Sequence, residues 1–180
     1  MNEPKPTPFT IRPLIEQDAA AFHAMRLHAA QNYPAGIVPT YEEEAAYTHE
    51  QNVARVRTSE TQIVFGAFDG ETLVGIAGLM RNARQKEAHK AFIWGVFVDP
   101  AYRRTGLGRQ LLVRAIAEAR ERGVMQVNLV VSSQNPRAQA LYRSLGFVRY
   151  GVEPRGLCIA GEYVDDELMV CFLDDPAVPD

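Results

Sequence analysis

A short turn between residues 98 and 109 holds the residue types that bind phosphate groups. It reads VDPAYRRTGLGR, so three arginines and two glycines follow an apolar run and open an amphipathic helix. Glycine allows a ligand to approach the backbone closely. The first amides of a helix have no intrahelical partner and carry the positive end of the helix dipole. Arginine charge beside such amides makes a cradle for an anion, and a pyrophosphate suits it.

The same turn lacks the signatures of two common nucleotide-binding motifs. A P-loop requires a lysine and a serine or threonine after its last glycine, and neither is present. The dinucleotide motif G-x-G-x-x-G requires a third glycine where this chain has Leu111, and no acidic residue occurs at positions 127–131. ATP and NAD are therefore disfavoured. Two interpretations of the turn remain. It binds a different pyrophosphate ligand, or it is a helix start that is rich in glycine and arginine and binds no ligand.

A second motif follows between residues 135 and 147. It reads NPRAQALYRSLGF, which is N-x-x-A-x-x-L-Y-x-x-x-G-F. The two motifs together, with one helix and one strand between them, resemble the GNAT superfamily of N-acetyltransferases, whose acetyl-CoA signature is [R/Q]-x-x-G-x-G/A after V-x-P. The resemblance covers about residues 9–173. It implies an α/β protein with the GNAT (acyl-CoA N-acyltransferase) fold, in which a mixed, splayed β-sheet has helices on both faces.

The resemblance also assigns the residues that bind the co-substrate acetyl-CoA. It implies that the strand before V-x-P splays from the next parallel strand, so that the pantetheine arm meets freed backbone. Gly95 within that strand independently indicates a bulge, a close backbone approach or a packing role. Asn135 matches a polar contact to the cofactor arm, although it also suits the cap of the following helix. The implied cofactor-binding residues are Val96, Phe97, Val98, Arg103, Arg104, Thr105, Gly106, Leu107, Gly108, Arg109 and Asn135.

Tyr142 matches the position of the family's usual general acid. Acetyl transfer expels a thiolate whose conjugate acid has a pKa near ~8.5, and a phenol with a pKa near ~10 is able to protonate it. The alternative is a core tyrosine whose hydroxyl is satisfied by the protein. No cysteine lies near the motifs, so the sequence predicts direct attack by the acceptor rather than an acetyl-enzyme.

The general base is not evident. Some relatives place a glutamate five residues before the asparagine, where this chain has Val130, and others place an acid on the strand 91–98, which contains none. A lysine-like amine starts near pKa ~10.4 and must become neutral before it attacks. A water relay remains, as do five side chains, each of which also suits a solvated surface: Glu43, Glu44, His89, Asp166 and Glu167.

Hydrophobic periodicity places these motifs on alternating strands and helices. The apolar run at 91–98 predicts a strand buried on both faces, and hence helices on both sides of the sheet. Thr40 and Glu43 form a capping box, which predicts one helix over 41–57. Strands are predicted at 9–14, 62–68, 72–80, 91–98, 126–132, 147–159 and 163–173, and helices at 16–31, 41–57, 106–122 and 136–145.

Composition bounds the class of protein. At 180 residues, with 19 basic and 22 acidic side chains, the chain predicts one domain of net charge −3, which argues against nucleic-acid binding. We expect a flexible lead-in at 1–8, one GNAT domain at 9–173 and a loose acidic tail at 174–180. No apolar run is long enough for a signal peptide or a membrane span. Cys158 and Cys171 form no motif and predict two buried thiols in a cytoplasmic protein without a metal site.

The sequence therefore predicts an N-acetyltransferase that moves the acetyl group of acetyl-CoA to a primary amine in a ternary complex. The acceptor is expected to be a small molecule held between the insert 32–44 and the strands after Phe147. Acidic residues there would attract a cationic amine, or would only be solvated. A non-catalytic acyl-CoA sensor and an enzyme acting on protein N-termini or lysines remain alternatives. A homodimer is open as well, since dimers are common in the family. The acidic set is Glu42, Glu43, Glu44, Asp165, Asp166 and Glu167.

Overall fold

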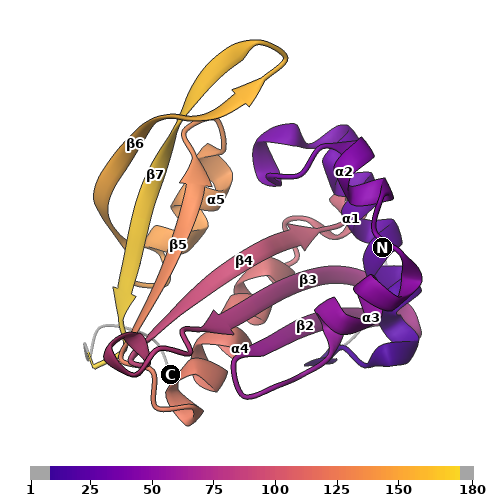
Figure 1. Ribbon diagram of the computed structural model, residues 1–180, viewed down its shortest axis with the longest axis horizontal. Helices are drawn as coiled ribbons and strands as arrows, with labels where there is room; N and C mark the ends of the chain where they lie inside the picture. Colours follow the sequence, from indigo (N-terminus) through magenta and orange to yellow (C-terminus); the bar gives the residue numbers. More distant parts are fainter. Residues whose placement is uncertain (1–8, 175–180) are drawn as a thin grey trace, which may run out of the picture.

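The computed structural model describes residues 9–174 and contains one seven-stranded sheet. The predicted lead-in 1–8, and the predicted tail beyond Asp174, lie outside the described residues. The strands run in the order β1-β2-β3-β4-β5-β7-β6, and every neighbouring pair is antiparallel except β4 and β5 (Figure 1). The strands are β1 (Thr10–Pro13), β2 (Gln62–Asp69), β3 (Thr72–Arg81), β4 (Lys90–Val98), β5 (Gln126–Ser132), β6 (Val148–Ile159) and β7 (Glu162–Phe172).

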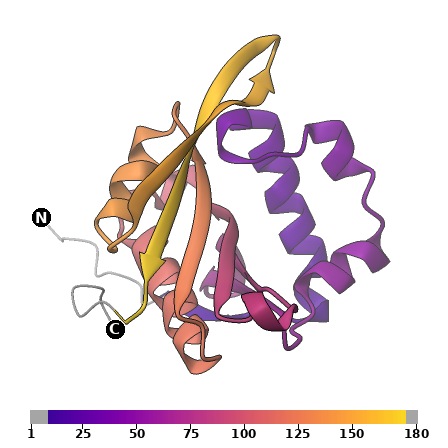
Figure 2. The same cartoon turned by 60° about the vertical axis from the view of Figure 1, so that its left-hand side comes forward.

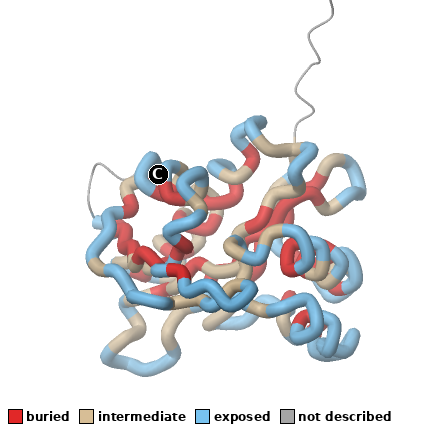
Figure 3. The backbone as a smooth tube through the Cα atoms, turned by 90° about the horizontal axis from the view of Figure 1, so that it is seen from above, coloured by how far each residue is buried: buried red, intermediate tan, exposed pale blue. Residues whose placement is uncertain are grey.

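Helices cover both faces of this sheet, as the sequence predicts (Figure 2). On one face, α4 (Leu107–Glu121) and α5 (Pro136–Arg143) contribute to a core with β2 to β5 and β7. On the other face, α1 (Ala19–Asn32) and α3 (His49–Val56) pack on β2, β3 and β4. The buried stretches gather between the layers, whereas the outer sides of the helices are exposed (Figure 3). The structure is thus an α/β protein with helices on both faces of a mixed sheet, as the resemblance implies.

The two parallel strands separate soon after they meet. β4 and β5 pair only at Lys90, Ala91 and Phe92, which face Gln126, Val127 and Asn128. Beyond Phe92 the two strands diverge, and the gap between their ribbons widens toward the carboxyl end of the sheet (Figure 1). The backbone of β4 from residue 93 onward therefore has no strand partner on this side. The predicted splay is confirmed.

A β-bulge lies at the centre of β4. The register to β3 shifts between Ile76 and Gly78, and Gly95 adopts a φ of +62°, which glycine tolerates and side chains rarely do. A Cβ on Gly95 would lie 2.9 Å from Nη1 of Arg26, so a close approach accompanies the bulge. The predicted bulge is confirmed, and the neighbour that leaves no room for a Cβ on Gly95 is the Arg26 side chain, which agrees with a packing role. The apolar run of β4 is only half buried, because its outer half lines the cavities described below.

The predicted single helix over 41–57 is wrong. The segment forms α2 (Tyr41–Ala45) and α3, with a break at Tyr47 and Thr48. The Thr40 capping box is present, and Thr48 forms a second one with Gln51, whose backbone amide donates to Thr48 Oγ1 at 3.2 Å. A second S/T-x-x-E/Q pattern inside the predicted helix was the signal for this break. Cys171 is buried as predicted, but Cys158 is exposed because its part of β6 projects beyond the core.

Candidate active site

A cavity of about 530 Å³ opens between the end of β4 and the start of α4. We call it the cradle cavity. It brings together every cofactor-binding residue proposed from the sequence except Thr105, whose hydroxyl instead donates to the Tyr102 carbonyl at 2.7 Å and closes the turn. Its lining includes Val96, Phe97, Val98, Arg103, Arg104, Gly106, Leu107, Gly108, Arg109 and Asn135.

The turn presents a row of free amides to this cavity. Within residues 9–174, the backbone N–H groups at 104–109 donate to no other group of the protein. Arg104 and Gly106 have φ values of +70° and +83°, and the chain turns sharply into α4 there. Unpartnered amides at a helix start are stabilised by an anion. The left-handed conformation of Arg104 is strained for a non-glycine residue, which is a common feature of ligand-binding turns.

Two arginines are held at the rim of the cradle cavity. Arg103 Nε donates to the Val98 carbonyl at 3.2 Å, and its guanidinium carbon lies 4.3 Å above the ring of Tyr33. Arg109 Nη1 donates to the Ser144 carbonyl at 3.2 Å. Arg103 thus occupies the carbonyl of Val98, the last residue of β4. Both positive charges are fixed beside the free amides, which favours a phosphate ligand.

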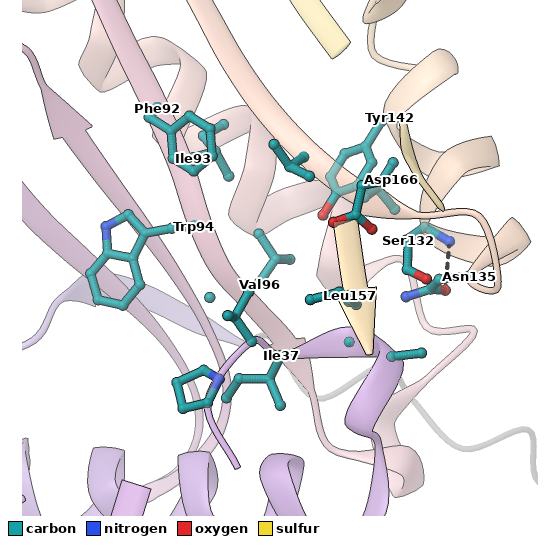
Figure 4. A pocket seen from close by; sticks show the side chains of 18 of the residues that line it. Ile37, Phe92, Ile93, Trp94, Val96, Ser132, Asn135, Tyr142, Leu157 and Asp166 are labelled. Atoms are coloured by element: carbon teal, nitrogen blue, oxygen red, sulfur yellow. Dashed lines mark hydrogen bonds between the residues drawn. The ribbon is translucent and has the colours of Figure 1, made fainter. Parts of the chain in front are cut away.

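A second cavity of about 330 Å³ lies inside the splay (Figure 4). We call it the splay cavity. Tyr142, Asn135 and Val96 line it, and both predicted walls contribute: Ile37 from the insert 32–44 and Leu157 from β6. Phe92 and Trp94, which sequence reasoning did not single out, line it as well. The residues that line both cavities, and so mark where they meet, are Ala35, Gly36, Val96, Asn135, Ala138 and Leu141.

Tyr142 is buried and turns its hydroxyl end toward the splay cavity (Figure 4). Its ring packs edge-on against Phe147, with centroids 5.8 Å apart. No group of the described part of the chain forms a hydrogen bond with the hydroxyl, which is therefore free to meet a ligand in the cavity. Burial raises the pKa of Tyr142 to about 12, because the charged phenolate loses hydration there. The side chain is therefore a neutral O–H donor at ordinary pH.

Asn135 caps α5 and lines both cavities. Its Oδ1 accepts a hydrogen bond from the Ala138 amide at 3.2 Å. The side-chain NH₂ group is not used by this cap, so the predicted double role is compatible with the geometry. Pro136 at the first helical position reinforces the start of α5.

Asp166 on β7 also points into the splay cavity (Figure 4). The residue is 6% exposed, and its Oδ1 is buried without a hydrogen-bond partner. Burial raises the pKa of this carboxyl, and the negative charges of Glu153 and Asp165 raise it further. Of the five candidate bases, Asp166 is the one whose side chain lies in the same cavity as Tyr142.

The other candidates are engaged elsewhere. Glu44 is fully buried and forms ion pairs with Arg26 at 3.0 Å and Arg55 at 2.6 Å, which contradicts a solvated surface. Glu167 points away from the cavity and pairs with arginines of α5 and β6. The Glu43 carboxylate accepts from the Thr40 amide in the capping box. His89 precedes β4 at the end opposite the splay, and its carbonyl accepts the amide of Met125.

Within residues 9–174, no group of three or more His, Cys, Asp or Glu side chains is arranged to hold a metal ion. In the same range, no helix combines the length and apolar character that a membrane crossing requires.

The splayed sheet, with helices on both faces and a helix start beside the splay, is the architecture of the acyl-CoA N-acyltransferases. A model of the acetyltransferase (GNAT) family matches residues 22–147, well over half of the chain, so the chain belongs to this family. Among solved structures, it resembles yncA of Salmonella typhimurium, a protein described as a putative acetyltransferase with its cofactor acetyl-CoA. The TM-score is 0.81 with 27% identity, over 96% of this chain and 98% of the other.

Two curated bacterial proteins show the same relationship in sequence. N-alpha-acetyltransferase RimI of Mycobacterium tuberculosis is 42% identical over 100 residues, which are 53% of this chain and 58% of that protein. The [ribosomal protein bS18]-alanine N-acetyltransferase of Escherichia coli strain K12 is 37% identical over 110 residues, or 57% and 72% of the two chains. The chain thus spans less than two thirds of the mycobacterial relative, and only 24% and 28% of two longer curated relatives.

Proposed function

We propose that the protein is an acetyl-CoA-dependent N-acetyltransferase that acts on a primary amine by direct attack in a ternary complex. The observation that carries this proposal is the meeting of the two cavities at the splay of β4 and β5. One cavity is lined by free amides and arginines, and the other holds a buried tyrosine and a buried carboxylate. Their junction is the place where a thioester from one side and an amine from the other come together.

The cradle cavity fits acetyl-CoA. Its free amides at 104–109, with Arg103 and Arg109, suit the pyrophosphate. The backbone of Val96 to Val98 that faces the splay suits the amide groups of a pantetheine arm, which would pair with it as a strand does, apart from the Val98 carbonyl that accepts from Arg103 Nε. A Cβ on Gly108 would come 3.3 Å from Leu141 Cδ2, and both residues line the cradle cavity, so a side chain at position 108 takes up space in that cavity.

Tyr142 is the proposed proton donor to the departing sulfur. Acetyl-CoA supplies the activated acetyl thioester, and the chain positions it and exchanges protons. The Tyr142 hydroxyl is neutral and not engaged by the protein, so it is available as a donor in the cavity. No cysteine lines either cavity within the described residues, which agrees with direct transfer rather than an acetyl-enzyme.

A protein N-terminus is the second candidate acceptor. The observation that favours it is the similarity to two relatives whose names specify N-terminal or ribosomal-protein alanine acetylation. The splay cavity is small for a folded protein, but the first residue of an extended peptide would fit between Ile37 and Leu157. A free α-amine is also a primary amine, so both acceptors use the same chemistry.

The test is a CoA-thiol release assay with acetyl-CoA and a panel of amines: propylamine, 2,2,2-trifluoroethylamine, lysine, spermidine and a hexapeptide that begins with alanine. Mass spectrometry of the products locates the acetyl group. Turnover of a small amine supports the main proposal, and turnover of the peptide alone supports the second. Tight acetyl-CoA binding by calorimetry without turnover on any amine would indicate the non-catalytic sensor instead.

A further inference from the structure

Asp166 differs from the other buried carboxylates of the described chain. Glu44 and Glu167 are each paired with two arginines, whereas Asp166 has no cationic partner and one oxygen without any hydrogen bond. We infer that Asp166 binds the ammonium group of the acceptor amine in the splay cavity and takes up its proton before acetyl transfer. This inference rests on the proposed acetyltransferase function and identifies its acceptor as a cationic primary amine.

The fold makes room for this carboxylate. On β7, Asp166 faces Ser132 of β5 on one side and Glu153 of β6 on the other. Between Glu153 and Leu157 the register of β6 shifts, and Arg155 adopts a φ of +56°. Gly156 follows, and a Cβ there would lie 2.7 Å from Oδ2 of Asp166. The bulge and the glycine therefore leave space that the carboxylate occupies at the cavity wall.

The surroundings of Asp166 lack a compensating charge. Glu153 and Asp165 are acidic, and Tyr142, which lines the same cavity, is neutral. Arg26 also lines the cavity, but its Nε and Nη2 are each 3.0 Å from Glu44. A buried carboxylate without a partner is costly, and a cation that enters the cavity relieves that cost. The remaining walls are largely apolar, which suits an amine on a small apolar or aliphatic body.

The same placement gives the proton a route. The acceptor enters as R–NH₃⁺, and one proton moves from nitrogen to the Asp166 carboxylate. The freed lone pair forms the N–C bond to the thioester carbon, while the C–S bond breaks and its electron pair goes to sulfur. A second proton leaves nitrogen as the Tyr142 hydroxyl gives one proton to sulfur and receives one. The products are a neutral amide and the CoA thiol, and Asp166 returns its proton to solvent.

Asp166→Asn is the variant that tests the inference, because it keeps the shape and removes only the charge. We expect kcat/KM for the best cationic amine of the panel to fall by about 10²–10⁴-fold, the usual effect of losing one acid–base group. Acetyl-CoA affinity by calorimetry should stay at the wild-type value. The thermal midpoint should stay level or rise, because an unpartnered buried charge is removed. Lower activity together with unchanged or higher stability is the signature of a functional carboxylate.

Glu167→Gln is the matched control on the neighbouring position of the same strand. Its carboxylate faces Arg143 at 2.9 Å and Arg149 at 3.5 Å, away from the cavity. Its loss should leave kcat/KM close to wild type and leave the thermal midpoint level or lower. An equal loss of activity in both variants would refute the specific role of Asp166.

Two further readouts separate proton transfer from simple packing. In Asp166→Asn, the deficit should shrink as pH rises toward the pKa of the amine, near ~10 for an alkylamine, because solvent then supplies the neutral form. 2,2,2-Trifluoroethylamine is uncharged at neutral pH, so its rate should fall by less than about tenfold in the variant. The same loss on charged and uncharged amines at every pH would overturn the inference while leaving acetyl transfer intact. A wild-type protein that acetylates no amine would overturn both.

Discussion

Removing the Tyr142 hydroxyl is the most direct test of the proposed acid. Tyr142→Phe keeps the ring, and with it the edge-on contact to Phe147. The hydroxyl makes no hydrogen bond within residues 9–174, so its loss leaves no broken pair behind. The protein should therefore remain as stable as wild type or become slightly more stable. A marked loss of stability in Tyr142→Phe would indicate that the hydroxyl has a structural role instead.

The size of the catalytic effect follows from the raised pKa. With a pKa of about 12, Tyr142 is a weaker acid than a thiol of pKa ~8.5, so complete transfer to the thiolate is uphill by roughly 3.5 units, or about 5 kcal/mol. Because of this cost, the phenolate form of Tyr142 does not accumulate during the reaction. Tyr142 instead donates as charge develops on sulfur and regains a proton in the same step. Loss of one such donor typically lowers kcat by about 10²–10³-fold, or roughly 2.7–4 kcal/mol.

Steady-state kinetics and calorimetry check this expectation together. We expect kcat to fall by about 10²–10³-fold, whereas acetyl-CoA affinity should change by less than about fivefold, since a neutral hydrogen bond contributes about 1 kcal/mol. Because the pKa is about 12, titration of Tyr142 should cause no alkaline decline of wild-type kcat up to pH ~10. A folded Tyr142→Phe protein that binds acetyl-CoA and turns over at the wild-type rate refutes the assignment.

Three other substitutions probe the cradle, the cap and the buried ion pairs. Gly108→Val should weaken acetyl-CoA binding about tenfold or more in calorimetry while the protein stays folded, because its methyl groups take up space in the cradle cavity. Unchanged affinity would exclude the cradle cavity as the site of the cofactor. Asn135→Ala should cost about 1 kcal/mol in chemical denaturation through the lost helix cap, and Asn135→Asp should not. Glu44→Gln should lower stability by about 3 kcal/mol and Tm by roughly 6–12 °C, because Arg26 and Arg55 lose their shared carboxylate. Burial alone raises the Glu44 pKa, but the two arginines lower it overall, so this contribution should persist above pH ~4.5 and disappear as pH falls through the folded value. A scan of Tm against pH that shows the same acid slope in wild type and Glu44→Gln would contradict the assignment.

The cradle was predictable because its parts are contiguous in the chain. Free amides, glycines and arginines between residues 103 and 109 depend on one strand-to-helix turn, and local rules describe such turns well. The bulge at Gly95 was predictable for a related reason, since a glycine inside an apolar strand indicates a backbone irregularity. The splay of β4 from β5 was implied by the resemblance to the family and not by the strand's own residues. The break between α2 and α3 was missed although its signal, the Thr48 capping box, is also local.

The fate of the acids was not predictable from the sequence. Glu44, Asp166 and Glu167 look alike in the chain, and each was expected to be solvated if it had no function. All three are buried, and they differ in which arginines reach them. Arg26 and Arg55 reach Glu44 across 18 and 11 positions, and Arg143 reaches Glu167 across 24. Such pairings depend on the packing of distant elements, which no local pattern encodes.

The presence or absence of an arginine partner therefore distinguishes a structural buried carboxylate from the proposed functional one in this molecule. Around Glu44, two arginines neutralise one carboxylate and tie α1, α2 and α3 together, so the general rule that buried charges are paired holds. Asp166 does not follow this rule, because its buried carboxylate has no cationic partner. The bulge in β6 and Gly156 leave the space that this carboxylate occupies. Of the three buried side-chain atoms without partners in the described chain, two belong to Trp94 and Asp166, which both line the splay cavity. Buried polar atoms without partners concentrate at functional sites, because a group that binds a ligand has no partner when the ligand is absent. Substitutions that satisfy or fill the splay cavity should consequently stabilise the protein and reduce its activity.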